Sequence, residues 1–200
     1  MNITPLFPRP VGLDTVTFLT EEERKHLLSY QDKLRPNYGN RITDSTYVLE
    51  DNELANLKQS LESALNKFFY DVYKTKQCKL YITQSWLNFA DKNEFHHRHW
   101  HPNSFISGVL YLQTISDDRI YFASNLEQFN MFEFDSEEYT LFNSNTWWMP
   151  VEDNSLILFP SNMNHEVKIN TSSTTRISLA FNSFIKGSIG NIPDLKKLNI

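Results

Sequence analysis

The stretch KLYITQSWLNF, residues 79–89, decides how most of this chain folds. Its pattern has a period of two, which places every second side chain on the same face of a β-strand. The segment before it repeats its apolar residues every three or four positions, as an amphipathic helix does. The chain is therefore expected to change from helices to strands near residue 79. One strand face would carry Leu80, Ile82, Gln84, Trp86 and Asn88, and the other Tyr81, Thr83, Ser85, Leu87 and Phe89.

The residues after this stretch predict further short strands. They are rich in β-branched and aromatic residues and are separated by Asn, Asp, Ser and Pro, and Asp117-Asp118 is expected to form a simple hairpin turn. About eight or nine strands in roughly a hundred residues favour a mainly β fold, either a two-sheet jelly roll or a barrel. The expected strands cover residues 104–113, 118–124, 130–134, 138–142, 154–160, 164–170 and 175–184.

Two helices are predicted in the first part of the chain. Thr20-Glu21-Glu22-Glu23 matches a capping box, in which the Thr20 and Glu23 side chains satisfy backbone N–H groups, and this helix should run to about Leu34. A second helix should run from about Asn52 to Tyr73. Both helices are expected to pack on the outside of one sheet. The second has a single apolar stripe formed by Leu54, Leu57, Leu61, Leu65, Phe68, Phe69 and Val72.

Length and charge restrict the class of protein. The 200 residues, 40% of them hydrophobic, suffice for one domain with a buried core. That domain should comprise a segment with two helices (1–76), a jelly-roll core (77–186) and a C-terminal tail (187–200). The net charge of −5 and the pI of about 5.7 disfavour a nucleic-acid partner, because a grip on the phosphate backbone needs a basic surface.

Three features favour a cytoplasmic location. Cys78 is the only cysteine, so an internal disulfide cannot form, and this fits a reducing compartment. The first residues, MNITP, lack the basic and apolar regions of a signal peptide. Nowhere does an apolar run approach the roughly 20 residues that a membrane span needs.

Four of the six histidines lie between residues 96 and 101. Imidazole suits iron, zinc, copper and nickel. In a strand, His99 and His101 would project from the same face and could chelate one ion, while His97 and His99 form a competing pair in the same register. A third ligand must come from elsewhere, and His165 is the only other histidine in the strand-rich part. Because a lone H-x-H is more often a solvated loop or an accidental cluster, the pair alone is weak evidence for a metal site.

Longer motifs around these histidines resemble a known family. The segments 99–104 (HWHPNS), 107–112 (SGVLYL), 156–161 (LILFPS) and 176–178 (RIS), with His165 between the last two, resemble iron(II)- and 2-oxoglutarate-dependent dioxygenases. More narrowly, they are similar to prolyl-hydroxylase-like oxygenases, many of them from bacteria or phages. The resemblance covers most of the chain. It implies a double-stranded β-helix, or jelly roll, with iron at one open end.

The resemblance also implies an activity and roles for individual residues. The activity is that of a hydroxylase that uses Fe(II), converts 2-oxoglutarate to succinate and CO2, and acts on a small molecule or on a peptidyl side chain such as proline. Arg176 matches the arginine that grips the far carboxylate of 2-oxoglutarate, and its always-charged guanidinium suits that task. The implied residues are His99, His101 and His165 for the metal, Arg176, Ser178 and Tyr111 for 2-oxoglutarate, and Trp86 and Asn88 for the substrate pocket.

Two observations keep other functions open. Most of the superfamily has a carboxylate where this chain has His101, and a neutral imidazole leaves the metal site one unit more positive. Arg176, taken alone, is also compatible with a structural ion pair to one of the 24 acidic residues. The alternatives are a cupin-like three-histidine metalloprotein that does not use 2-oxoglutarate, and a non-catalytic jelly-roll binding or structural protein.

Overall fold

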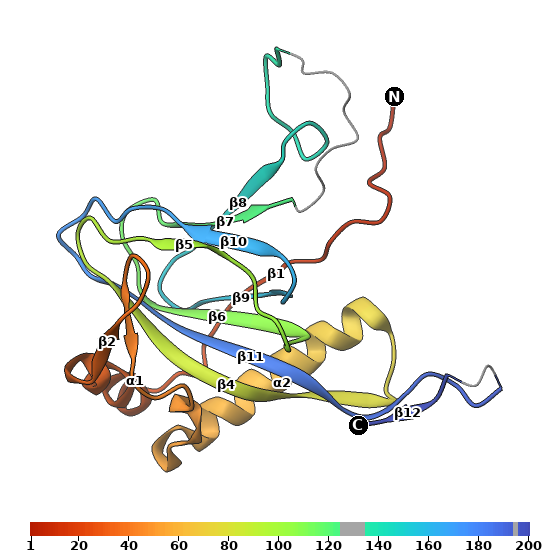
Figure 1. The fold of residues 1–200 in the computed structure, drawn as a ribbon, viewed down its shortest axis with the longest axis horizontal. Helices are drawn as coiled ribbons and strands as arrows, with labels where there is room; N and C mark the ends of the chain where they lie inside the picture. The colour runs from red at the N-terminus through yellow and green to blue at the C-terminus, as the bar shows by residue number, and fades with distance from the viewer. Residues whose placement is uncertain (125–134, 194–195) are drawn as a thin grey trace.

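The computed structural model describes residues 1–124, 135–193 and 196–200. Figure 1 shows a mainly β structure of two sheets lying over one another, with the helices on the outer side of the larger sheet. The predicted mainly β class with two α-helices is therefore confirmed. Among the described residues, we find no helix with the length and apolar character that crossing a membrane requires.

Both sheets are antiparallel and join strands that are distant in sequence. Because β11 lies between β6 and β4, three separate parts of the chain share the face that looks toward the smaller sheet. The larger sheet runs β1 (Gly12–Thr15), β9 (Ser155–Pro160), β6 (Ile106–Gln113), β11 (Arg176–Ile189), β4 (Cys78–Ala90), β3 (Arg41–Thr43) and β2 (Leu34–Pro36), and β12 (Leu198–Asn199) pairs with β11. The smaller sheet runs β5 (His96–His99), β10 (Asn164–Val167), β7 (Arg119–Ala123) and β8 (Thr146–Pro150).

The two predicted helices are present, but the first is shorter than expected. The capping box is formed, with Glu23 N–H donating to the Thr20 hydroxyl at 3.2 Å and Thr20 N–H donating to the Glu23 carboxylate at 2.9 Å. The first helix does not reach Leu34, because that residue begins β2 and pairs with β3 instead. The helical elements are α1 (Glu21–Leu28), the 3-10 turns η1 (Ser29–Asp32), η2 (Val48–Glu50) and η3 (Asn52–Leu54), and α2 (Ala55–Tyr73).

The helices close the outer face of the larger sheet. Figure 1 shows α2 crossing behind β4 and β11. Its stripe, with Leu57, Leu61 and Leu65 fully buried, packs in one core with the outer side chains of the sheet. Each such leucine stabilises the fold by about 1.5–3 kcal/mol through burial. The outer face is thus occupied by packing, and the face between the sheets is left for a site.

The face pattern predicted for residues 79–89 is wrong in its first half. Gln84 pairs with Asn182, whereas Ile82 pairs with Ser183, so Thr83 is an extra residue that forms a bulge in β4. One extra residue reverses the alternation of faces. The helix-facing set is therefore Leu80, Ile82, Leu87 and Phe89, and the set directed toward the smaller sheet is Gln84, Trp86 and Asn88.

Other strand predictions also need correction. Residues 138–142 form turns, because Thr140 N–H donates to Asn143 Oδ1 at 2.6 Å, and such local side-chain bonds compete with sheet pairing. The strand expected at 130–134 lies outside the described residues. Conversely, β8 was not among the expected strands, although it pairs with β7 along its whole length.

Candidate metal centre

Three of the histidines meet at one end of the space between the sheets. His99 ends β5 and pairs in register with His165 on β10, so the sheet itself sets their separation. The ligand nitrogens of His99, His101 and His165 all lie within 4.8 Å of one another. The two-residue spacing predicts that His101 lies in the same strand as His99. The structure instead places His101 in the loop after β5, where its backbone N–H donates to Ser161 O at 2.9 Å. The structure therefore brings together the three residues that the sequence singled out.

Backbone carbonyls fix the orientation of two of the three rings. His99 Nδ1 lies 2.8 Å from His97 O, and His165 Nδ1 lies 3.0 Å from Met163 O. Because a carbonyl oxygen only accepts, each Nδ1 must carry the proton, and each Nε2 is left with a free lone pair. Such outer hydrogen bonds orient metal-ligating histidines in general. The local geometry thus prepares two Nε2 atoms as ligands.

The environment keeps these histidines neutral. Burial, followed by the proximity of His99, lowers the pKa of His101 to about 3. Burial also lowers the pKa of His99, and that of His165 well below the usual range. Since the neutral imidazole is the form that binds a metal, all three rings are ready to act as ligands at neutral pH.

A second histidine group overlaps the first. The ligand nitrogens of His96, His97 and His99 also lie within 4.8 Å of one another. His97 Nδ1 is 3.2 Å from Tyr38 O, in an exposed contact. His99 has one free nitrogen and can serve only one ion, so the two groups exclude each other as complete triads. The competing pair of His97 and His99 is therefore still open on geometry alone.

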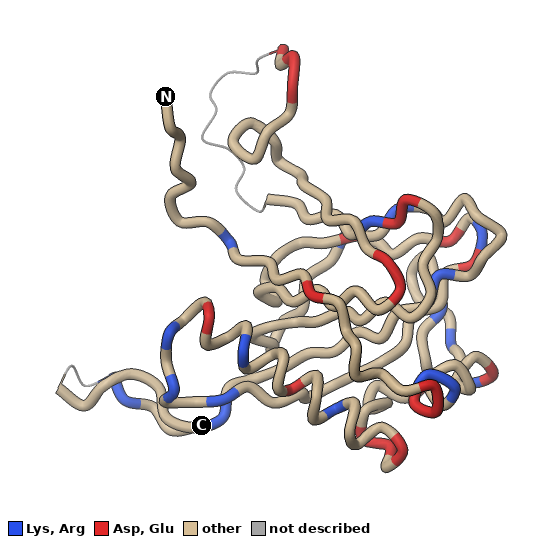
Figure 2. Tube along the Cα trace, turned by 180° about the vertical axis from the view of Figure 1, so that it is seen from behind, with Lys and Arg blue, Asp and Glu red and all other residues tan. Residues whose placement is uncertain are grey.

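A narrow cavity runs inward from the three histidines. Its volume of about 30 Å³ exceeds the roughly 10–15 Å³ that a cavity needs to hold one water molecule. Figure 2 shows the charged residues mainly on helices and loops, and the strands around this space are mostly tan. Trp86, Asn88, Tyr111 and Ser178 line the cavity, as the sequence analysis expects, and Arg176 is absent from its lining among the described residues.

Tyr111 places an unsatisfied hydroxyl in this cavity. The side chain is 1% exposed, and its hydroxyl is the one buried side-chain polar atom without a hydrogen-bond partner among the described residues. A buried polar group left unpaired costs about 1–3 kcal/mol. Burial, and then the nearby Asp118 carboxylate, raises the pKa of Tyr111, so the hydroxyl keeps its proton. It is available as a donor to an anionic ligand.

Arg176 is buried next to this cavity and already has a partner. Its Nε donates to Asp118 Oδ2 at 2.7 Å and to Oδ1 at 3.0 Å, and its Nη1 donates to Lys168 O at 3.3 Å. The structural ion pair considered in the sequence analysis is therefore present. Asp117, with a φ of 56°, occupies the expected turn, but Asp118 is 4% exposed and is more than a turn residue. The two partners are 58 positions apart in the sequence, so no local pattern indicated this pair.

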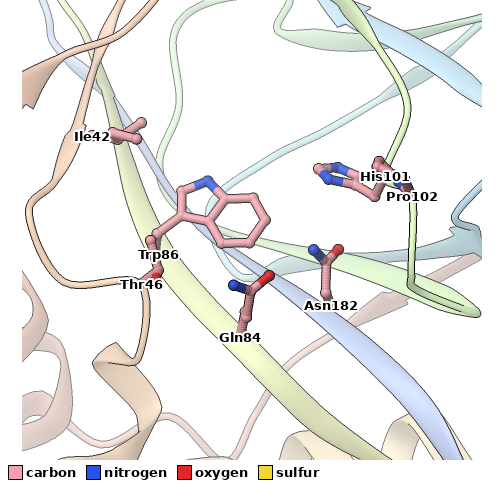
Figure 3. Close-up of a pocket in the computed structure, with 7 residues that line it drawn as sticks. All are labelled: Ile42, Thr46, Gln84, Trp86, His101, Pro102 and Asn182. Atoms are coloured by element: carbon pink, nitrogen blue, oxygen red, sulfur yellow. The ribbon is translucent and has the colours of Figure 1, made fainter.

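A wider pocket opens on the other side of His101. Its volume is about 300 Å³, and Figure 3 shows Trp86, Gln84 and Asn182 facing His101 across it. Trp86 belongs to both spaces, with its ring centroid 5.6 Å from that of His101. A group held in this pocket would lie directly beside the histidine cluster. The sequence pattern predicts that Gln84 shares a strand face with Trp86 and Asn88, but it indicates no role for Gln84 or Asn182.

A neutral three-histidine centre at the mouth of a two-sheet β fold defines the class of non-haem metal proteins. The family comparison narrows this class. Residues 84–182 match the family model described as "Putative 2OG-Fe(II) oxygenase". The chain belongs to the 2OG-Fe(II) oxygenases, whose members use Fe(II) and 2-oxoglutarate. A search of curated proteins found no relative of this chain.

Solved structures with the same fold are similar to most of the chain. An oxidoreductase of the 2OG-Fe(II) oxygenase family from Burkholderia pseudomallei has 13% identity and a TM-score of 0.60, over 86% of this chain and 83% of that one. A prolyl-4-hydroxylase from Pseudomonas putida has 14% identity and a TM-score of 0.54, over 88% and 94%. HygX from Streptomyces hygroscopicus, with nickel, 2-oxoglutarate and hygromycin B bound, has 12% identity and a TM-score of 0.55, over 88% and 82%. At these identities, the likeness shows the fold.

The residues present fit the family's cofactor and, in part, its co-substrate. Three neutral imidazoles are suitable ligands for Fe(II). The unpartnered Tyr111 hydroxyl fits a carboxylate oxygen, and Arg176 lies close enough for its charge to act to lower the pKa of Tyr111. The fit to 2-oxoglutarate is partial because the cavity volume is only about 30 Å³ and Arg176 is not among the residues that line it.

Proposed function

We propose that the protein is an Fe(II)- and 2-oxoglutarate-dependent hydroxylase with His99, His101 and His165 as metal ligands. The observation that carries this proposal is the convergence of three neutral histidines on one point, with the orphaned Tyr111 hydroxyl deeper in the same cavity. In this proposal the two sheets form a double-stranded β-helix. When bound, the metal and 2-oxoglutarate would supply oxygen activation, with oxidation of 2-oxoglutarate to succinate and CO2.

The residues of the chain would bind and orient the co-substrate. The Tyr111 hydroxyl and Ser178, which are opposite one another on β6 and β11, would donate to its far carboxylate. Arg176, whose Nε stays bonded to Asp118, would donate a further guanidinium N–H to the same carboxylate. The surrounding apolar side chains Val109, Ile120 and Ala180 would exclude water.

The class of substrate that we propose is suggested by the similar solved structures. The similar structures include a prolyl hydroxylase from Trichoplax adhaerens in complex with a peptide fragment, and HygX with hygromycin B. We therefore propose a peptidyl side chain or a small molecule as substrate. A cytoplasmic setting fits the single, buried Cys78.

Oxygen-dependent formation of succinate tests the proposal directly. Wild type with Fe(II) and 2-oxoglutarate should form succinate slowly even without substrate, and His165→Ala should abolish this. His97→Ala is the matched control, because His97 belongs only to the competing triad. If His97→Ala abolishes succinate formation and His101→Ala leaves it intact, the ligand assignment is wrong. If wild type forms none, and 2-oxoglutarate does not bind the Fe(II) form anaerobically, the hydroxylase proposal fails.

A specific observation favours one competing function. Arg176 is paired with Asp118 and the cavity is small, which suits a three-histidine metalloprotein that does not use 2-oxoglutarate. The two functions differ in an anaerobic titration of the Fe(II) form. A visible absorption band that grows with 2-oxoglutarate, and that Arg176→Met weakens without loss of metal, supports the hydroxylase. No spectral change with 2-oxoglutarate supports the competing function.

A further inference from the structure

We propose that the pocket beside His101 binds an uncharged peptide group of the substrate, with Asn182 Nδ2 donating a hydrogen bond to its carbonyl oxygen. This inference rests on the proposed function, because it names the substrate chemistry of the same site. The pocket is lined by Ile42, Thr46, Gln84, Trp86, His101, Pro102 and Asn182 (Figure 3).

The Asn182 side chain is hydrogen-bonded to a chain of serines. Ser107 Oγ donates to Asn182 Oδ1 at 2.9 Å, and the chain continues from Ser107 to Ser161 at 2.8 Å and from Ser161 to Ser104 at 2.7 Å. Each hydroxyl carries one proton. If Ser107 donates to Asn182, the proton between Ser161 and Ser107 must come from Ser161, and that between Ser104 and Ser161 from Ser104. Ser104 in turn accepts from Ser183 N–H at 3.3 Å.

This chain leaves the amide nitrogen of Asn182 for a ligand. The residue is 7% exposed, and its Nδ2 makes no hydrogen bond to another described residue. Figure 3 shows the nitrogen turned toward Trp86 and Gln84, and the oxygen turned away from them. Because the nitrogen is the atom that faces Trp86 and Gln84, Asn182 offers this part of the pocket a donor. The matching group on a ligand is an acceptor.

The residues that line the pocket favour an uncharged acceptor. They include no Lys, Arg, Asp or Glu. A charged ligand group would be partly desolvated here without a counter-ion, which is costly. A carbonyl oxygen meets the requirement, whereas a carboxylate or an ammonium group does not.

The neighbouring side chains favour a planar amide over a simple ketone. Gln84 is exposed and can turn its oxygen toward an N–H group, and in Figure 3 this oxygen lies on the side of Asn182. The Trp86 indole offers a flat apolar surface for a ring or an amide plane. A donor from Asn182, an acceptor from Gln84 and a stacking face together match the C=O and N–H of a peptide. A nucleobase in a nucleic acid also offers a C=O and an N–H group, but the protein's net charge of −5 disfavours binding to nucleic acid.

Ligand-observed saturation-transfer NMR on the metal-free chain tests this recognition independently of catalysis. The probes are N-acetyl-proline methylamide, which is uncharged, and N-acetyl-proline, which carries a carboxylate. Wild type should bind the methylamide about tenfold more tightly, since one hydrogen bond and one desolvated charge separate the two probes. Equal binding of the two probes, or tighter binding of the neutral base 1-methyluracil, would overturn the proposal.

Asn182→Asp tests the donor with almost no change in shape. The variant keeps an oxygen for Ser107 but replaces the Nδ2 donor by a charged acceptor, so methylamide binding should fall about tenfold. Asn52→Asp makes the same charge change at an exposed position and should leave binding unchanged. Ser107→Ala frees the amide to rotate and should give a smaller loss. Unchanged binding in Asn182→Asp contradicts the proposal, whatever the outcome of the succinate assay. Succinate formation without probe binding refutes the peptide pocket and leaves the oxygenase proposal standing.

Discussion

Asp118→Asn separates a co-substrate role for Arg176 from a purely structural one. The two side chains are 1% and 7% exposed, so the pair is almost fully removed from solvent. Replacing the carboxylate leaves the guanidinium as a buried, uncompensated charge, which costs about 3–5 kcal/mol. For a domain of this size, 1 kcal/mol shifts Tm by about 2–4 °C. Asp118→Asn should therefore lower Tm by about 6–20 °C.

The response to 2-oxoglutarate then distinguishes the two roles. If its far carboxylate reaches Arg176, the co-substrate supplies the anion that Asp118→Asn lacks. Thermal unfolding with Zn(II) and increasing 2-oxoglutarate should then show a larger rise in Tm for Asp118→Asn than for wild type. A ligand at a hundred times its Kd stabilises the folded state by about 2.7 kcal/mol, which is measurable on this scale.

A double variant provides the control. Asp118→Leu with Arg176→Met removes both charges, and replacing a buried pair by apolar side chains is often neutral for stability. It should recover most of the lost Tm and show no rise with 2-oxoglutarate. If 2-oxoglutarate raises Tm equally in wild type and in the double variant, Arg176 does not bind it. If Asp118→Asn costs under about 1 kcal/mol, the pair is not what holds the arginine in place.

Three further variants test other parts of the structure. Tyr111→Phe removes an unpaired hydroxyl, so in urea unfolding the unliganded fold should be as stable as wild type or more stable by about 1 kcal/mol. The same variant should weaken 2-oxoglutarate binding. A large loss of stability would mean that the hydroxyl has a partner. Gly108→Ala should destabilise by about 1–3 kcal/mol, since its Cβ would lie 2.1 Å from the Phe181 ring; wild-type stability would contradict this packing. Burial and the hydrogen bond to Asp51 raise the pKa of Tyr30 to about 12. The contribution of this group to the free energy of unfolding is therefore complete below pH 10 and should be lost as the pH rises from 10 to 12. Tyr30→Phe should flatten this part of the stability profile, and an unchanged slope would contradict the assignment.

The histidine cluster could be predicted because the spacing and the number of the histidines can be read directly from the sequence. The two-residue spacing of His99 and His101 needs only an extended chain, and His165 was the one remaining histidine in the strand-rich part. The structure adds the pairing of His99 with His165 across β5 and β10. It also places His101 in the loop after β5. The ligand atoms of His99 and His101 are therefore close together, as predicted, although the strand ends at His99.

The details that the sequence did not supply depend on partners far away in the chain. The bulge at Thr83 is defined by the pairing of β4 with β11, which the sequence does not reveal. A prediction that omits the bulge assigns Leu80 and Ile82 to the wrong face of the strand. The burial of Asp118 likewise depends on Arg176, and a pair of aspartates in sequence favours a turn on local grounds alone. Periodicity thus predicts that strands exist, whereas register and buried ion pairs are decided by tertiary contacts.

The charges around the cavity connect the unusual ligand set with the co-substrate. A divalent ion held by three neutral imidazoles brings two positive charges into a cavity whose described lining contains no Asp or Glu. The nearest buried carboxylate, Asp118, is already balanced by Arg176. An isolated buried charge is costly, so a centre of this composition favours an anionic ligand more strongly than one that has a carboxylate of its own. A dianion that reaches from the metal to Tyr111 would satisfy the metal charge and the orphaned hydroxyl together, which is why His101 in place of a carboxylate is compatible with 2-oxoglutarate binding.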